Sequence, residues 1–308
     1  MFSLLKKRTL ISIVVTSYNR EQYIKECIDS ILSQDIDKEI ICIDDCSTDK
    51  TCDILQDYEN KYEELSVYQN EKNSGIVFTR YQGLIRCKGE YMLFVDSDDY
   101  LLPNSLNKLY WEAKNNNADI LEFSSQTDGS DEFKKALKRP NYIIDITPLE
   151  AYSNKQLKNQ LWNKLISRKV YKKAIKNMNM EIKHEDFSDV VYFLYHFLIN
   201  SDRVITTETE GYFYYDKRGM TAHIDTLGRL KQYCGFGITK NELENVYGKI
   251  PELTNTWNYV CNQAVCTLLE LSEEEQKEHM HQLYRLMSEN AAKKLIEGHK
   301  QLMKQKDK

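Results

Sequence analysis

Residues 89–99 read Gly-Glu-Tyr-Met-Leu-Phe-Val-Asp-Ser-Asp-Asp, so five apolar residues run directly into three carboxylates. A short continuous apolar run is typical of a strand buried on both faces. Carboxylates gathered at the end of such a strand repel one another unless a cation or ligand groups offset their charge. An Asp-x-Asp pair suits a hard divalent ion, which completes its shell with substrate phosphates. The competing interpretation is an ordinary acidic turn.

Similar patterns lie on both sides of this stretch. Strand-like runs occupy 10–15, 39–43 and 65–68, and helical spacing occupies 24–32, 50–63 and 76–87. Pro103 is expected in the first turn of a further helix. This alternation predicts an α/β fold with a mostly parallel sheet flanked by helices. The carboxyl ends of the strands then share one edge, where ligands of such sheets bind.

The rest of the chain predicts a second, helical region. We expect a loop or short strand over 125–147, helices over 148–200, an aromatic strand at 212–215 and helices only from about 220. The last helix is expected to carry Met280, Leu283, Met287, Ala291 and Leu295 on one face. The expected domains are 1–218, with a nucleotide-binding half (8–125) and an acceptor half (126–218), and a helical region, 219–308.

Composition excludes several classes of protein. The 308 residues carry a net charge of −5, which lacks the basic field of a nucleic-acid binder. We find no apolar run long enough to span a bilayer, and the start does not have the order of a signal peptide. The eight cysteines contain no Cys-x-x-Cys pair, so we interpret them as reduced thiols of a cytoplasmic protein.

Together these motifs resemble the family 2 inverting glycosyltransferases of GT-A fold. Residues 13–19 are similar to the opening strand and nucleotide loop, and residues 43–49 to the second motif, in which glycine usually replaces Cys46. Residues 73–81 resemble a motif that usually ends in Arg-Asn, from which Tyr81 departs. Residues 89–99 match the metal motif closely, and the order and spacing agree over about 100 residues.

Three later segments extend the resemblance. Residues 161–165 resemble a segment of bacterial members that act on polysaccharide acceptors, and an amphipathic helix with a buried Trp is the alternative. His184-Glu185-Asp186 is similar to the acceptor-side Glu-Asp pair, with first-turn helix acids as the alternative. Residues 214–218 resemble a strand and basic loop that reach the donor diphosphate, with a solvated turn as the alternative.

The resemblance implies a role for each matching residue. The nucleotide is held by Thr16, Tyr18, Asn19, Arg20, Asp45, Arg80 and Asp96. A Mn²⁺ or Mg²⁺ ion is bound by Asp98, with Asp99 assisting. Asp186, beside Glu185, is the base that takes the acceptor proton, and Asp189 is a rival for that role. Contacts to the diphosphate or acceptor are assigned to Trp162, Lys164, His184, Lys217 and Arg218.

The function implied is metal-dependent transfer of a hexosyl or N-acetylhexosaminyl group, with inversion, from a nucleotide sugar. The nucleotide is expected to be UDP. The acceptor is a glycan or lipid-linked sugar of a bacterial capsule, lipopolysaccharide or other surface polysaccharide. The lysine-rich end of the chain favours either docking at the inner face of the membrane or packing, including contact between copies.

Two alternatives come from other classes. A sugar nucleotidyltransferase also uses a parallel sheet and acidic metal site, but residues 16–20 lack the glycine its phosphate loop needs. A non-catalytic scaffold of the same fold is the other alternative, and the intact Asp-x-Asp and Glu-Asp motifs argue against it.

Overall fold

The structure is a computed structural model, and it describes residues 8–178, 189–218 and 226–306. The chain divides into two compact units, residues 1–184 with 196–219, and residues 185–195 with 220–308. The boundary expected after residue 218 stays a prediction.

The first unit is built on a nine-stranded sheet with the order β3-β2-β1-β4-β8-β6-β9-β5, in which β7 also pairs with β9. The strands are β1 (Ile11–Ser17), β2 (Lys38–Asp44), β3 (Leu65–Gln69), β4 (Tyr91–Asp96), β5 (Tyr100–Leu101), β6 (Ile120–Thr127), β7 (Tyr142–Ile143), β8 (Lys164–Ser167) and β9 (Val204–Tyr214). Strands β1 to β4 pair in parallel, whereas β8 is antiparallel to β4 and β6. The α/β fold is confirmed, and the sheet is mixed rather than mostly parallel.

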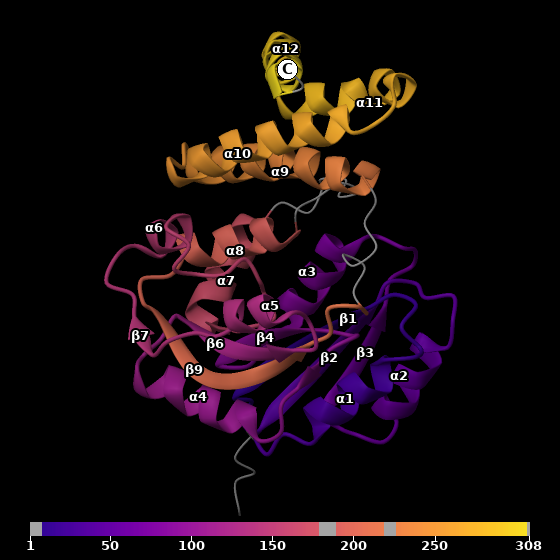
Figure 1. Ribbon diagram of the computed structural model, residues 1–308. Coiled ribbons are helices and arrows are strands. Elements are labelled where there is room, and N and C mark those ends of the chain that lie inside the picture. The colour runs from indigo at the N-terminus through magenta and orange to yellow at the C-terminus, as the bar shows by residue number, and fades with distance from the viewer. Residues whose placement is uncertain (1–7, 179–188, 219–225, 307–308) are drawn as a thin grey trace, which may run out of the picture. The chain divides into compact units, whose positions relative to one another are not determined.

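Helices cover both faces of this sheet. They are α1 (Ile24–Leu32), α2 (Thr51–Glu59), α3 (Ile76–Arg86), α4 (Ser105–Asn115), α5 (Asp131–Ala136), α6 (Pro148–Ser153) and α7 (Arg168–Asn177), while α8 (Asp189–Ile199) is shared between the units. Helices α1, α2 and α4 lie on one face, and α3 and α7 on the other (Figure 1). Helix α3 approaches β1 closely at Gly83, where a Cβ would lie 2.2 Å from Val14 Cγ1.

The parallel half follows directly from its residues. The side chains of β1 are buried along the whole strand, and α1 buries Ile24, Cys27, Ile28 and Ile31 at helical spacing. Burial of these apolar faces in one core, together with strand pairing, holds the strands and helices in place.

Three local expectations were wrong. Pro103 precedes α4 rather than standing in its first turn, because Asn104 is the N-cap and takes a left-handed φ of 56°. Residues 164–167, expected in a helix, form β8, because they pair with β4 and β6. Residues 125–147, expected to be a loop or short strand, contain the helix α5, which Ser130 caps. The strands at 120–124 and 204–211 were not predicted.

The second unit is helical in its described residues. It contains α9 (Thr226–Tyr247), α10 (Glu252–Leu269), α11 (Glu273–Leu286) and α12 (Glu289–Lys306). The face expected on a single last helix is divided between α11 and α12, because α11 ends at Met287 in an extended conformation. In the described part of the chain, no helix has both the length and the apolar character needed to cross a membrane.

Candidate active site

Parallel pairing brings the ends of β1, β2 and β4 to one edge of the sheet. Ser17 is in register with Asp44, and Thr16 with Asp96. The loops that follow these strands, residues 16–20, 44–49 and 96–99, form what we call the carboxylate edge. The predicted convergence of the acidic motifs is thus present in the structure.

Asp96 is held by a buried arginine. Arg80 Nη2 donates to Asp96 Oδ1 at 2.7 Å, and the Arg80 guanidinium also lies over the ring of Phe94, 5.8 Å from its centroid. Only 7% of the Arg80 side chain is exposed, against 27% for Asp96. The carboxylate therefore faces the open side of the edge, and the arginine supports it from behind.

Asp98 lies beside Asp96 and is nearly buried. Arg20 Nε is 3.5 Å from Asp98 Oδ2. Burial, followed by repulsion from Asp96, raises the pKa of Asp98, whereas the charge of Arg20 lowers it. A bound cation would favour the ionised form of this carboxylate in the same way as Arg20.

Asp99 has a different environment. It is 2% exposed, and its two oxygens accept hydrogen bonds from the Tyr212 hydroxyl and the Tyr215 backbone N–H, both at 2.8 Å. Burial raises the pKa of Asp99 to about 9, and Asp96 adds to this shift. This geometry favours a link to β9 over the expected assistance to a metal ion.

Tyr212 is a residue that the sequence did not single out. Its hydroxyl donates to Asp99 and accepts the backbone N–H of Asp96 at 3.1 Å, so it closes the 96–99 turn from behind. It lies in the aromatic segment expected to be a strand, but four consecutive aromatic residues give no signal as to which of them points toward the carboxylates.

Asp45 organises the loop before α3. It accepts hydrogen bonds from Asn70 Nδ2 (2.7 Å) and from the backbone N–H groups of Ser74 (2.8 Å) and Gly75 (2.9 Å). A carboxylate has about four lone-pair positions, so these three bonds leave capacity for one more donor. The expected hydrogen bond to a nucleotide base is compatible with this geometry.

The loop after β1 is locked to the loop after β2. Asn19 has a φ of 52°; its N–H donates to Ser47 Oγ, and its side-chain oxygen accepts from the Thr48 N–H. Thr16 is buried, whereas Tyr18 is 38% exposed and available for stacking. Cys46 also has a positive φ, of 61°, which explains physically why glycine is usual there.

Two expected acceptor or diphosphate residues are buried. Trp162 stacks on Tyr212 and Tyr214, with centroid distances of 4.6 and 5.4 Å, and is 6% exposed. Lys164 is fully buried, and its ammonium lies 2.9 Å from Glu122 Oε2. Burial lowers the pKa of Lys164. Neither side chain is open to a ligand, so these two expectations do not fit the structure.

The basic loop after β9 contacts α1. Arg218 Nη1 lies 2.6 Å from Glu26 Oε2, and its guanidinium stacks on Tyr215, 3.3 Å from the ring centroid. Lys217 is exposed. Only Nη1 of Arg218 is bonded to Glu26, so its other N–H groups remain for the expected contact with a diphosphate.

The expected base, Asp186, lies outside the described residues, as do Glu185 and His184. Asp189, its rival, is the first residue of α8.

The carboxylate edge fits a hard divalent cation. Asp96 and Asp98 offer oxygen ligands, and the raised pKa of Asp98 reflects burial and repulsion that a cation would offset. In the part of the chain that the structure describes, no group of three or more His, Cys, Asp or Glu side chains is placed to hold a metal ion. A cation here would therefore need a diphosphate and water to complete its shell.

Comparison with known proteins gives a consistent result. The sequence profile described as glycosyl transferase family 2 matches residues 12–202. The poly(ribitol-phosphate) beta-glucosyltransferase of Bacillus spizizenii is 34% identical over 206 residues, which are 62% of this chain but only 32% of that protein. The cholesterol galactosyltransferase of Borreliella burgdorferi is 30% identical over 265 residues, covering 78% of this chain and 71% of that protein.

A solved structure shares the fold. Residues 1–349 of TarS from Staphylococcus aureus, crystallised with UDP-GlcNAc, match with a TM-score of 0.67 at 21% identity. The match covers 90% of this chain and 80% of that one.

Proposed function

The chain belongs to glycosyl transferase family 2, and on that premise we propose that it transfers a sugar from a UDP-sugar to a hydroxyl group of a bacterial surface polysaccharide. The proposed reaction is metal-dependent and inverts the anomeric carbon. The observation that carries the proposal is the carboxylate edge, where Asp45, Asp96 and Asp98 meet beside Arg20 and Arg80. The UDP-GlcNAc complex of TarS supports UDP as the nucleotide.

Donor binding is assigned to the loops of this edge. Tyr18 offers an exposed ring for the base, and Asp45 offers its remaining acceptor position to a ring N–H. Asp96, oriented by Arg80, is directed at the ribose or the donor sugar.

Bond cleavage requires neutralisation of the departing diphosphate. A divalent ion held by Asp98 would act as a Lewis acid and template for that charge. Arg20 already lies next to Asp98 and adds a fixed positive charge. Arg218 is a further donor through its N–H groups that are not bonded to Glu26.

The acceptor hydroxyl is a weak nucleophile, so a carboxylate within hydrogen-bond reach must accept its proton. We assign this role to Asp186, with Asp189 as the rival. Attack on the face opposite the diphosphate turns an α-linked donor into a β-linked product. Asp186→Asn is expected to abolish transfer and keep UDP binding, whereas loss of transfer only in Asp189→Asn would move the role to Asp189.

The test of the donor is a panel of UDP-, GDP-, CDP- and dTDP-sugars with Mn²⁺, Mg²⁺ or EDTA, in which the released nucleotide diphosphate is measured. Release from a UDP-sugar that EDTA and Asp98→Asn both abolish is expected. Asp57→Asn, at an exposed aspartate of α2, is the matched control and should keep full activity. Pyrophosphate released from UTP and a sugar 1-phosphate, with no nucleoside diphosphate released from any nucleotide sugar, would indicate a nucleotidyltransferase. No turnover with any donor and acceptor would favour a scaffold.

The names of the two relatives give different acceptors, a phosphate polymer for one and a sterol for the other. We propose the polymer for this chain, because its first unit carries a cluster of basic side chains away from the carboxylate edge.

A further inference from the structure

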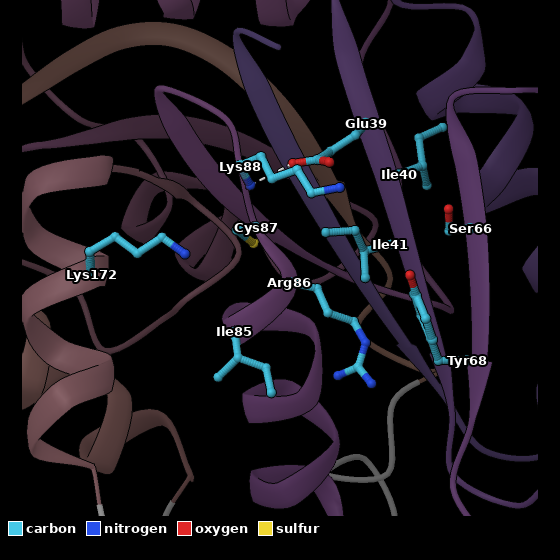
Figure 2. A pocket seen from close by; sticks show the side chains of 10 residues that line it. All are labelled: Glu39, Ile40, Ile41, Ser66, Tyr68, Ile85, Arg86, Cys87, Lys88 and Lys172. Atoms are coloured by element: carbon cyan, nitrogen blue, oxygen red, sulfur yellow. Dashed lines mark hydrogen bonds between the residues drawn. The ribbon is translucent and has the colours of Figure 1, made fainter.

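A second concave site lies beside the far end of α3. It has a volume of about 370 Å³ and is lined by residues of β2, β3, the end of α3 and Lys172 of α7. Figure 2 shows its side chains, among them Arg86, Lys88 and Lys172. We call it the basic pocket, after these three residues.

The basic pocket is separate from the carboxylate edge. Helix α3 has eleven residues, and so it spans roughly 16 Å along its axis. Its first turn follows Gly75, which contacts Asp45, whereas Arg86 ends the helix. A ligand in the basic pocket therefore does not occupy the proposed donor site.

Positive charge exceeds negative charge in the lining of this pocket, with three cations against one acid. Glu39 is the one acidic residue of the lining, and its Oε1 accepts hydrogen bonds from Ser12 Oγ and the Lys88 backbone N–H. Within the described ranges, Arg86, Lys88 and Lys172 form no ion pair. In a chain with a net charge of −5, such a group predicts an anionic ligand.

Helix α7 extends the basic surface. Its ten residues include five cations and no acid. Lys169 is paired with Asp119 and Asp202, but Lys173 and Lys176 are exposed. A second pocket differs, because three of its four cations pair with Glu90 or Asp119, and the fourth, Arg168, donates to the Gly89 carbonyl. Cations without an ion pair thus line the basic pocket, and exposed lysines continue along α7.

In one wall of the basic pocket, ring stacking and hydrogen bonds hold the side chain of Arg86 in place. The Arg86 guanidinium lies over the Tyr68 ring, 4.3 Å from its centroid, and Nη1 donates to the Gln82 carbonyl and side-chain oxygens. A guanidinium fixed in this way suits the paired oxygens of a phosphate. Tyr68 is 40% exposed and offers a ring surface to the carbon skeleton next to that phosphate.

We propose that the basic pocket binds a phosphate group of an anionic acceptor chain, such as a polyol phosphate. The inference rests on the proposed transferase function and adds a second contact for the acceptor. A concave pocket with a stacked arginine favours a discrete phosphate between polyol units over a flat membrane surface. Retention of the chain here would raise the local concentration of its hydroxyl groups near the active site.

The test is calorimetric binding of a synthetic ribitol-phosphate octamer to the full chain. The triple variant Arg86→Gln, Lys88→Gln, Lys172→Gln is expected to bind about tenfold more weakly. A matched variant, Lys61→Gln, Lys108→Gln, Lys134→Gln, removes the same charge from other exposed lysines and should bind as the unaltered protein does. Mn²⁺-dependent UDP binding is measured on the same samples and should be equal in all three.

Equal octamer affinity in the two triple variants would overturn the proposal. Binding to vesicles of equal parts phosphatidylglycerol and phosphatidylcholine that only the pocket variant loses, with no octamer binding, would also overturn it in favour of a membrane surface. If the protein binds the octamer through these residues but neither binds UDP nor releases it from any donor, the proposed transferase function fails and the phosphate site stands.

Discussion

The backbone N–H of Asp96 donates to the hydroxyl of Tyr212 at 3.1 Å, although the two residues lie 116 positions apart in the chain. The same hydroxyl donates to Asp99 at 2.8 Å. One buried side chain from β9 therefore holds both ends of the turn that carries Asp98. Groups behind a metal ligand orient it, and their loss typically weakens metal binding.

Tyr212→Phe is expected to lower Mn²⁺ affinity by about tenfold or more, because the 96–99 turn loses its support. Tyr171→Phe is the matched control, since Tyr171 is equally buried and donates one hydrogen bond, to the Gly89 carbonyl at 2.7 Å. Each variant should lose about 1 kcal/mol of unfolding free energy. Mn²⁺ titration by electron paramagnetic resonance separates them, and equal affinities would show that Tyr212 acts on stability alone.

Cys46→Gly is expected to raise the unfolding free energy by about 1 kcal/mol, because Cys46 holds a φ of 61° that disfavours a side chain. Asn104→Gly is the control, since Asn104 has a φ of 56° but asparagine tolerates this region. Urea denaturation measures both. A gain at Asn104 as large as that at Cys46 would contradict the explanation from backbone strain.

Lys164→Met is expected to destabilise the protein by about 3 kcal/mol and to leave UDP affinity unchanged. The reason is that removing one partner of a buried ion pair leaves Glu122 only partly compensated, by Arg139 at 2.7 Å. Lys138→Met, at a half-exposed lysine near the same strands, is the control and should cost little. Lost UDP affinity at unchanged stability would restore a diphosphate role for Lys164.

His196 makes stability depend on pH. Burial lowers the pKa of His196 to about 3, below its ordinary value of 6.5. The folded state thus holds the neutral form of His196. The contribution of this group to the unfolding free energy is complete above pH 6.5 and is lost as the pH falls toward 3. The loss should approach roughly 1.4 kcal/mol per pH unit in this window. His196→Gln should flatten the acid limb of unfolding free energy against pH, and an unchanged slope would assign that limb to carboxylates.

Much of the parallel half of the fold could be predicted from the sequence. The apolar runs of β2 and β4 end in carboxylates, and the run of β1 ends in polar residues. Periodicity and composition therefore predict both the strands and the shared edge on which Asp45, Asp96 and Asp98 lie.

The mixed half of the sheet, β5 to β9, could not be predicted in the same way. Residues 204–211 are rich in threonine and glutamate, and they form a strand because β6 pairs with them, with shifts of register at Phe123 and Ser124. The resemblance of residues 161–165 to a family segment implied ligand contacts for Trp162 and Lys164, and the motif alone did not show that both side chains are buried. The role of Tyr212 depends on which of several neighbouring aromatic side chains points to the carboxylate edge, and only the folded structure gives that.

The central claim is that the carboxylate edge holds a nucleotide diphosphate through a divalent ion on Asp98. The most direct test is calorimetric UDP affinity with Mn²⁺ and with EDTA, for the unaltered protein and for Asp98→Asn. We predict binding that Mn²⁺ strengthens at least about tenfold, a gain that Asp98→Asn abolishes. UDP affinity that is indifferent to both Mn²⁺ and the substitution would contradict the account.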